Sequence, residues 1–403
     1  MANFLLMTSE LSPFSLKIQS CLSYNGHTYK SLPGQGSKVQ NTLQAIKVEI
    51  AKRRGKIYKH PKMTKLDEYP GVPFLIEPKG RVQYDSSAIS RWLDTQNSPI
   101  TDRKLWPQDP TLAFVAQLID EAGDDFIIHL AHHLRWFHSA DTNDAGERLF
   151  KEFSNFPLFS RKKGFPTWFG KRQVSRLPYL FSMPPADVQQ DVPKYLKAPI
   201  KADWPETHTL LDQLWNDFIL ALENILCSQP YLLGNSFTIA DASIFGMFGM
   251  LLDDPAAEQD MLKRTPTLHK WLWKIKNNQH ALDANGGESD LKVSDKLIAL
   301  LDIIMNTFVP LMKQNEAAYE QYTAQGETLF NEEAWRQDKA LFEGELMGHP
   351  FKTVTKSFTV QVWRDIKDNW ASLSDKQRGD LSARVSGLAD LESDSDKGVK
   401  LSA

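Results

Sequence analysis

The sequence predicts an α/β domain at the N-terminus, an all-helical second domain interrupted by a long insertion, and a mainly helical C-terminal extension. Strand and helix signals alternate over the first hundred residues. From about Asp109 onward, apolar residues recur mostly at the spacing of helices. With 403 residues the chain is too long for one compact unit, so two or three domains are expected.

The N-terminal region begins with a strand, a helix and a second strand. The run "NFLLM" is typical of a buried strand, and "HTYKSL" is the second candidate. A helix is expected from Pro13, because proline is favoured at the first helical position and Ser12 is a good N-cap. Asn25-Gly26 supplies its end, and Cys21 lies on its apolar face, where we expect it to be part of the core.

A hairpin and another helix complete this region. The segment "VPFLIEPKGRVQY" predicts two strands joined by a turn at Pro78-Lys79-Gly80. Asp85-Ser86-Ser87 opens the next helix. The basic stretch "KVEIAKRRGKIYKHPKMTK" between the two halves is expected to form a helix and a loop. The predicted order is therefore βαβ, an excursion, and ββα.

The remainder is helical with one long interruption. "TLAFVAQLIDEAGDDFIIHLAHHLRWFH" is a long amphipathic helix, and prolines and aromatics break the pattern from about 140 to 204. Helices resume at "HTLLDQLWNDFILALENILCSQ", and "LDANGGESD" is a linker. We place the domains at 1–100, 105–283 and 291–390, and we expect the polar segment 391–403 to be disordered.

Composition narrows the class of protein. Hydrophobic residues make up 41% and charged residues 24%, and a net charge of −3 argues against a general electrostatic grip on nucleic acid. Two cysteines exclude a disulfide framework and fit a reducing compartment. The N-terminus lacks the basic start and apolar core of a signal peptide, and no stretch reaches the roughly 18–20 apolar residues of a membrane span. A cytoplasmic, soluble protein is expected.

Three short motifs occur in a recognisable order. They are "VPF" at Val72 to Phe74, "DSSAI" at Asp85 to Ile89, and "FTIAD" at Phe237 to Asp241, which has the form of a helix capping box. With the predicted topology they make the chain resemble the cytosolic glutathione transferase superfamily over about 3–100 and 105–280. The remaining residues are similar to extended bacterial transferase-like proteins, whose long helix carries an element like "HHLRW" at His132 to Trp136.

The resemblance implies a thioredoxin-like first domain that binds glutathione as co-substrate. It implies that Pro73 is cis and exposes the backbone of Val72, on which the cysteinyl unit pairs like an added strand. Asp85 would face the γ-glutamyl ammonium, and Ser86 with nearby helix-start amides would face the carboxylate. Related proteins usually carry Gln or Glu at the position of Asp85, so its reach is shorter here.

The three serines of "TSELSPFSLK" are the candidates for activating the thiol. A free thiol with a pKa of about 8.5 is only a few per cent ionised near pH 7, and lowering that pKa by about 2 units takes about 2.7 kcal/mol. One hydroxyl donating to the thiolate supplies about 1.5–3 kcal/mol, and a helix N-terminus about 0.3–2 kcal/mol more. Ser12 is the first candidate, Ser9 the second and Ser15 the third. Capping alone is a competing explanation of Ser12.

The resemblance also implies a homodimer and transfer of the thiolate to a small, apolar electrophile, as in detoxification. The second-substrate pocket would involve His133, Arg135 and Trp136. The side chains of Asp125, His129 and His132 or His133 lie on neighbouring helical turns, but no zinc motif is present, and we expect no metal.

Two alternatives stay open at this point. One is a non-catalytic module that uses the fold for dimerisation or partner binding. The other is a different glutathione-dependent enzyme, such as a lyase, dehalogenase, isomerase or peroxidase.

Overall fold

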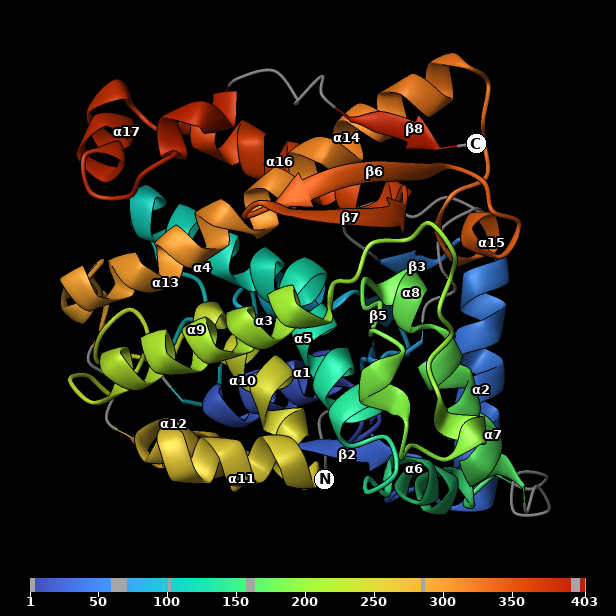
Figure 1. Cartoon of the computed structure of the whole chain (residues 1–403). Coiled ribbons are helices and arrows are strands. Elements are labelled where there is room, and N and C mark those ends of the chain that lie inside the picture. Colours follow the sequence, from blue (N-terminus) through green and yellow to red (C-terminus); the bar gives the residue numbers. More distant parts are fainter. Residues whose placement is uncertain are drawn as a thin grey trace.

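We describe the chain from a computed structural model, which covers residues 4–58, 71–96, 98–100, 103–156, 164–283, 287–392 and 399–402. Parts of the predicted loop after the basic stretch, of the predicted linker and of the predicted disordered tail lie outside these ranges. Figure 1 shows the C-terminal extension lying along one side of the helical domain, with the insertion beside it and the N-terminal domain behind the insertion.

The N-terminal domain is a five-stranded sheet with its helices. Its elements in chain order are β1 (Phe4–Met7), α1 (Pro13–Tyr24), β2 (Tyr29–Leu32), α2 (Lys38–Arg53), β3 (Ile57–Tyr58), β4 (Phe74–Ile76), β5 (Val82–Tyr84) and α3 (Ser86–Leu93). The strand order is β2-β1-β4-β5-β3, with β1 parallel to β2 and antiparallel to β4. The predicted βαβ and ββα order is confirmed, with one short extra strand, β3.

Local chemistry explains the first helix. Ser12 is its N-cap, accepting from the amide of Ser15, and Pro13 is its first residue, as predicted. Cys21 is fully buried in the main core. A Cβ on Gly246 of α10 would lie 2.6 Å from the carbonyl oxygen of Pro13, so this glycine permits the close packing of α1 on α10.

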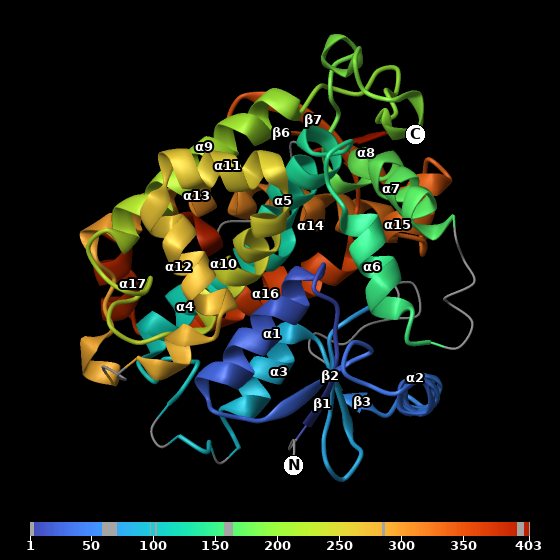
Figure 2. The same ribbon diagram turned by 90° about the horizontal axis from the view of Figure 1, so that it is seen from below.

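The second domain is a helical bundle around α10. Its elements in chain order are α4 (Pro110–Ala122), η1 (Gly123–Ile127), α5 (Ile128–His133), η2 (Leu134–His138), α9 (His208–Leu226), α10 (Ile239–Gly249), η6 (Met250–Asp253), α11 (Pro255–Arg264), α12 (Pro266–Lys276) and η7 (Gln279–Leu282). The predicted capping box is present at the start of α10, between Thr238 and Asp241. Figure 2 shows α1 and α3 side by side between the N-terminal sheet and this bundle. The predicted fold class is confirmed.

The long helix predicted from Thr111 is not a regular α-helix throughout. Two five-residue stretches, η1 and η2, have π-helical hydrogen bonding. Such wider turns are uncommon and are frequently found at functional sites. They change which side chains share a face of the helix after Ala122.

The insertion touches all other parts of the chain. It contains α6 (Ala145–Phe153), α7 (Phe165–Ser175), α8 (Leu177–Leu180), η4 (Asp187–Gln189) and η5 (Lys194–Leu196). After α6, the side-chain amide of Asn155 donates to the carbonyl oxygen of Pro33 at 3.3 Å. At the end of α7, Arg176 pairs with Glu332 of the extension at 2.7 Å. The insertion therefore connects the three other regions.

The extension is mainly helical, but it also contains a sheet that the sequence did not indicate. Its elements are η8 (Glu288–Asp290), α13 (Asp295–Asn306), α14 (Phe308–Ala324), α15 (Asn331–Arg336), β6 (Leu341–Leu346), β7 (His349–Val354), α16 (Ser357–Ser372), α17 (Asp375–Ser382), η9 (Leu388–Glu392) and β8 (Lys400–Ser402). The sheet order is β7-β6-β8. The prediction of a disordered tail is therefore wrong for Lys400–Ser402, because these residues pair antiparallel with β6.

Aromatic and polar contacts fix the extension on the second domain. The rings of Phe114 on α4 and Trp370 on α16 lie 5.1 Å apart. Nearby, the amide of Asn369 donates to the Gln117 side chain at 2.6 Å.

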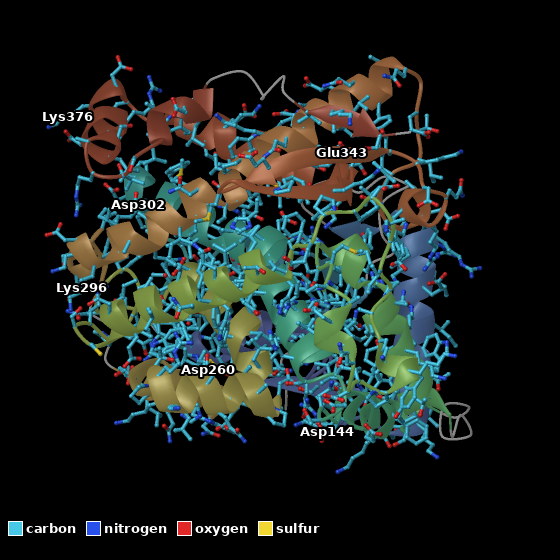
Figure 3. All side chains as sticks on the ribbon, in the orientation of Figure 1. Asp144, Asp260, Lys296, Asp302, Glu343 and Lys376 are labelled. Atoms are coloured by element: carbon cyan, nitrogen blue, oxygen red, sulfur yellow. The ribbon has the colours of Figure 1, made fainter. Side chains whose placement is uncertain are left out.

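Among the described helices, none combines the length and apolar character needed to cross a membrane. Figure 3 shows labelled charged side chains on outer elements of the bundle, insertion and extension, from Asp144 to Lys376.

Candidate functional site

The three serines of the loop between β1 and α1 have different surroundings. Ser9 is buried, and its hydroxyl donates to the Glu152 carboxylate of α6 at 2.7 Å. Ser15 is fully buried, and its oxygen accepts from the amide of Ser9. Ser12 is partly exposed. Of the three hydroxyls, that of Ser12 is the most accessible to a ligand.

Ser12 faces the strand edge that the sequence indicated. Its hydroxyl lies 3.5 Å from the carbonyl oxygen of Val72, at the long limit of a hydrogen bond, and the Val72–Pro73 peptide bond is cis. Because this contact is long, the hydroxyl proton can turn toward another acceptor at small energetic cost. The structure thus brings Ser12, Val72 and Pro73 together.

A cavity of about 90 Å³ continues from this edge between α1, α3 and the helical domain. Its lining residues come from the N-terminal domain, from α4 and η1, and from α16 of the extension: Phe14, Val72, Pro73, Tyr84, Asp85, Ser86, Ser87, Glu121, Asp124, Asp125, Phe358 and Val362. Four of the predicted residues, Val72, Pro73, Asp85 and Ser86, therefore lie in one cavity wall. Its volume is below the range of about 300–1,000 Å³ for whole-ligand pockets, so it fits the end group of a larger ligand.

Asp85 and Ser86 stand at the start of α3. Asp85 is the N-cap, with its carboxylate accepting from the amide of Ala88 at 2.9 Å, and its φ is 74°. A left-handed backbone at a non-glycine residue costs about 1–3 kcal/mol and is found preferentially at functional sites. Within the described residues, the amides of Ser86 and Ser87 have no hydrogen-bond partner, so they are available to an anionic group.

The cavity wall is strongly acidic. Burial, the largest effect, raises the pKa of Asp85 to about 7, that of Asp124 to about 6, and that of Asp125 to about 8. Burial and the nearby Asp120 and Asp124 carboxylates also raise the pKa of Glu121 well above its usual range. Carboxyl groups that hold protons near pH 7 in a concave site would release them to bind a cation.

One buried lysine partly balances this charge. Lys17 of α1 is fully enclosed, 2.6 Å from Asp120 and 2.8 Å from Asp124. Burial lowers the pKa of Lys17, but the surrounding carboxylates outweigh burial and raise it above its ordinary value. The hydroxyls of Ser86 and Ser87 donate to Asp124 and Asp120, at 3.2 and 2.8 Å. The hydroxyl of Ser86 would have to turn before it could bind a ligand's carboxylate.

The structure has two other hollows, and one of them adjoins the first. One, of about 20 Å³, shares Asp125 with the cavity and is lined also by His129, Phe181 and Lys356. Its volume is that of about one water molecule. Another, of about 270 Å³, is lined by Leu16, Arg148, Asp253 and Lys276 among others. Arg148 and Lys276 both pair with Asp253 there, so these three charges compensate one another.

The residues predicted for a second-substrate pocket do not line these three hollows. His133, Arg135 and Trp136 are all buried, at 0%, 1% and 4% exposure. Arg135 pairs with Asp254 at 2.7 Å and also donates to the carbonyl oxygen of Met250. The ring of Trp136 packs edge-on against Phe169 of the insertion.

We therefore correct the prediction for these three residues. The polar atoms of His133 and Arg135 and the ring of Trp136 already contact protein groups. Their burial leaves no surface to an apolar substrate. Arg135 instead supports the serine loop, since its guanidinium donates to the carbonyl oxygen of Leu11 at 3.4 Å.

Sequence reasoning missed several residues of the site. The acidic run "DEAGDD" contains Glu121, Asp124 and Asp125. The signals available in the sequence were this cluster of carboxylates and a single lysine, Lys17, in the otherwise uncharged helix α1. Phe358 and Val362 had no such signal, because their role depends on how the extension folds back. Glu152, whose pKa burial raises to about 7, was hidden in the insertion.

An α/β domain of thioredoxin type with a cis-proline edge, joined to a helical bundle with a capped central helix, defines the glutathione transferase fold. Residues 189–280 match the family model described as "Glutathione S-transferase, C-terminal domain". This domain match confirms the predicted resemblance to the glutathione transferase superfamily.

Several solved structures are similar to this chain at low identity. The β-etherase LigF from Sphingobium sp. strain SYK-6 is 17% identical, with 70% of this chain and 97% of that chain covered and a TM-score of 0.42. A glutathione transferase family member from Pseudomonas fluorescens Pf-5 with bound glutathione is 16% identical, with 69% and 97% covered and a TM-score of 0.34.

A GST-like protein from Pseudomonas syringae is 16% identical, with 76% and 75% covered and a TM-score of 0.38. Likenesses with TM-scores this low support no conclusion about the reaction. No curated protein matches the chain.

Proposed function

We propose that the protein binds glutathione and activates its thiol for attack on a small electrophile. One observation carries this proposal: the Ser12 hydroxyl lies 3.5 Å from the carbonyl oxygen of Val72, next to cis-Pro73. The wall of the cavity continues from there to Asp85 and Ser86. A hydroxyl that can donate to the thiolate, a backbone edge for the cysteinyl unit and a pocket for the γ-glutamyl end therefore follow one another in the same order as these parts of glutathione.

The γ-glutamyl end of glutathione suits the cavity. Its ammonium group would be attracted by the carboxylates of Asp85, Asp124 and Asp125. Its carboxylate would accept hydrogen bonds from the amides of Ser86 and Ser87 at the start of α3. The cysteinyl backbone would lie along Val72, and its sulfur would lie at the N-terminus of α1.

Ser12 is the proposed partner of the thiolate. Its hydroxyl is partly exposed and only weakly engaged, whereas the hydroxyl of Ser9 is committed to Glu152. A hydrogen bond to a charged sulfur, together with the α1 N-terminus, supplies about the 2.7 kcal/mol that a pKa reduction of about 2 units requires.

Three further expectations stay predictions. These are a homodimer, a cytoplasmic location, and an apolar electrophile of the kind met in detoxification. Sedimentation equilibrium of the full chain tests the dimer. The binding place of the electrophile is open, now that His133, Arg135 and Trp136 are seen to be enclosed.

Isothermal titration with glutathione tests the proposal first. We expect binding at millimolar concentration or below, and weaker binding of glutathione whose γ-glutamyl amine has been acetylated, because the acidic wall then loses its cation. Absence of binding at millimolar glutathione would overturn the proposed function.

Turnover of a chlorinated aromatic compound is the second measurement. Binding with turnover supports the transferase. Binding without turnover of that or related electrophiles favours a non-catalytic module or another glutathione-dependent reaction.

A further inference from the structure

Three histidines and one aspartate converge beside the base of the insertion. The Nε2 atoms of His133 and His138 lie 3.0 and 2.7 Å from Oδ1 of Asp212. The Nε2 atom of His208 lies 3.2 Å from Oδ2 of the same carboxylate. The four candidate ligand atoms, one from each residue, all lie within 4.8 Å of one another.

Irregular helix geometry brings these residues together. His133 and His138 are five positions apart, and η2, the π-helical stretch Leu134–His138, places such a pair on one face. His208 and Asp212 are four positions apart on the first turns of α9, so they share a face of a regular helix. The two faces meet where α5 and η2 lie against the start of α9.

The surroundings of His133 hold its ring in one orientation. Its Nδ1 atom lies 2.9 Å from the Ser182 hydroxyl, which can accept a hydrogen bond from Nδ1–H and leave the Nε2 lone pair directed at the cluster. The ring of Phe137 stacks on His133 at 5.3 Å and lies 4.6 Å from His208. A metal-binding histidine typically has such an outer hydrogen bond and an apolar wall.

We propose that His133, His138, His208 and Asp212 bind one Zn²⁺ ion. Three imidazoles and a carboxylate supply the four ligands that structural zinc sites use. With zinc–nitrogen distances of about 2.0–2.1 Å, ligand atoms of a tetrahedral site lie about 3.3 Å apart. The three histidine–Asp212 separations of 2.7–3.2 Å are close to this value. The other ligand atoms, which all lie within 4.8 Å of one another, would have to draw together by at most about 1.5 Å. If the cluster served only to hydrogen-bond the Asp212 carboxylate, fewer than three imidazole rings would be enough.

This proposal revises our expectation that the chain has no metal. Of the residues considered from the sequence, Asp125, His129 and His132 or His133, only His133 belongs to this cluster. His132 instead uses Nδ1 to contact the carbonyl oxygen of Ile128 at 2.9 Å. His208 and Asp212 escaped the sequence analysis because they lie about 70 residues further along the chain.

The position of the cluster indicates what the ion would do. His138 immediately precedes the insertion and His208 immediately follows it, so one ion would join both ends of a long loop. An ion that binds the folded chain and not the unfolded chain stabilises the fold by mass action. The site is separate from the glutathione cavity, and the inference does not depend on the proposed function.

Metal content and affinity test the proposal with the full chain, without a histidine tag. After removal of metal by a chelator and addition of Zn²⁺, we expect one tightly held zinc per chain and a higher midpoint of thermal unfolding. Co²⁺ in place of Zn²⁺ should give the visible absorption of a tetrahedral nitrogen–oxygen site. Failure to retain zinc, or zinc binding with no change in unfolding, would overturn the proposal.

Variants locate the ion. His138→Ala and His208→Ala should each lower zinc affinity by at least tenfold and remove the Co²⁺ spectrum. His349→Ala, in β7 and outside the cluster, is the matched control and should change neither. Circular dichroism of the metal-free variants checks folding. Equal zinc affinity in the cluster variants and the control would contradict the assignment.

Discussion

The hydroxyl of Ser9 donates a 2.7 Å hydrogen bond to Glu152, a residue of the insertion 143 positions further along the chain. Glu152 also accepts from the amide of Glu10, so the insertion fastens the loop that precedes α1. Because the proton of Ser9 is committed to a carboxylate, the neighbouring Ser12 is the better partner for a bound thiolate. The insertion therefore contributes to the site by holding a loop rather than by contacting a ligand.

Ser12→Ala should raise the pKa of the bound glutathione thiol by about 1–2 units, because a charged hydrogen bond is worth about 1.5–3 kcal/mol. Near pH 6.5, kcat/KM should fall by about tenfold or more. Ultraviolet difference absorbance of the thiolate, followed against pH, measures the shift. Unfolding should also become easier by about 0.5–2 kcal/mol, since Ser12 caps α1.

Ser37→Ala is the control for the lost cap. Ser37 caps α2 by accepting from the amide of Gln40, and it lies outside the cavity wall. This variant should lose comparable stability with no change in thiol pKa. If Ser12→Ala leaves the thiol pKa unchanged, Ser12 is only a helix cap.

Affinity for S-methylglutathione should increase between about pH 5.5 and 8. Burial raises the pKa of Asp85 to about 7 and that of Asp125 to about 8, so both carboxyls hold protons at the acidic end of this range. A neutral carboxyl does not attract the ligand's ammonium, and binding must release those protons. Each proton released gives up to about a tenfold change in affinity per pH unit. Titration calorimetry in buffers of different ionisation enthalpy counts them.

Asp85→Asn is the matched variant for this test. Asparagine still caps α3, so the fold is kept, while one titrating group disappears. Binding should weaken by at least about tenfold near pH 8, and fewer protons should be released. A dissociation constant that is flat with pH in the unaltered protein would show that the acidic wall does not hold the ammonium.

Short-range signals predicted the N-terminal half of the site. The start of α1 at Pro13, the cap at Ser12 and the hairpin before α3 follow from local residue chemistry. The sequence did not indicate the β6–β7 hairpin, whose turn residues Met347 and Gly348 have φ of 52° and 77°. Such turns are normally indicated by Asn-Gly, and methionine hides the signal.

Long-range packing decided the remainder of the site. Phe358 and Val362 reach the cavity only because α16 folds back onto α4. Similarly, the strand at Lys400–Ser402 exists because β6 offers an edge, since the tail itself has no strand pattern. In the long helix, η1 and η2 change the facing of side chains, so the regular spacing used for Asp125, His129 and His132 or His133 did not apply.

The extension should control access to the glutathione cavity. Val362→Phe adds a ring inside a hollow of about 90 Å³ and should weaken glutathione binding by at least about tenfold, at a stability cost of about 1–3 kcal/mol. Gln361→Phe places the same ring on the exposed face of α16 and should leave binding unchanged. Titration calorimetry, with thermal unfolding as the check on folding, compares the two. Unchanged affinity in the Val362 variant would exclude this cavity as the γ-glutamyl site.

Arg135→Ala should destabilise the protein by about 3–5 kcal/mol, because it leaves the fully buried carboxylate of Asp254 without its ion-pair partner. Denaturant unfolding measures the loss. Replacing both residues by alanine should cost less than the sum of the two single changes, since the orphan charge then disappears. Arg53→Ala, which breaks the exposed pair with Glu49, is the control and should cost at most about 0.5 kcal/mol.

The same variant separates a structural role of Arg135 from substrate contact. Its guanidinium also reaches the carbonyl oxygen of Leu11, so the loop carrying Ser12 should loosen and the affinity for glutathione should fall. An electrophile bound elsewhere should keep its KM, because Arg135 is enclosed. A variant of unchanged stability with a raised KM for the electrophile alone would restore Arg135 to the second-substrate pocket. The buried pair with Asp254 makes that outcome contrary to what we expect.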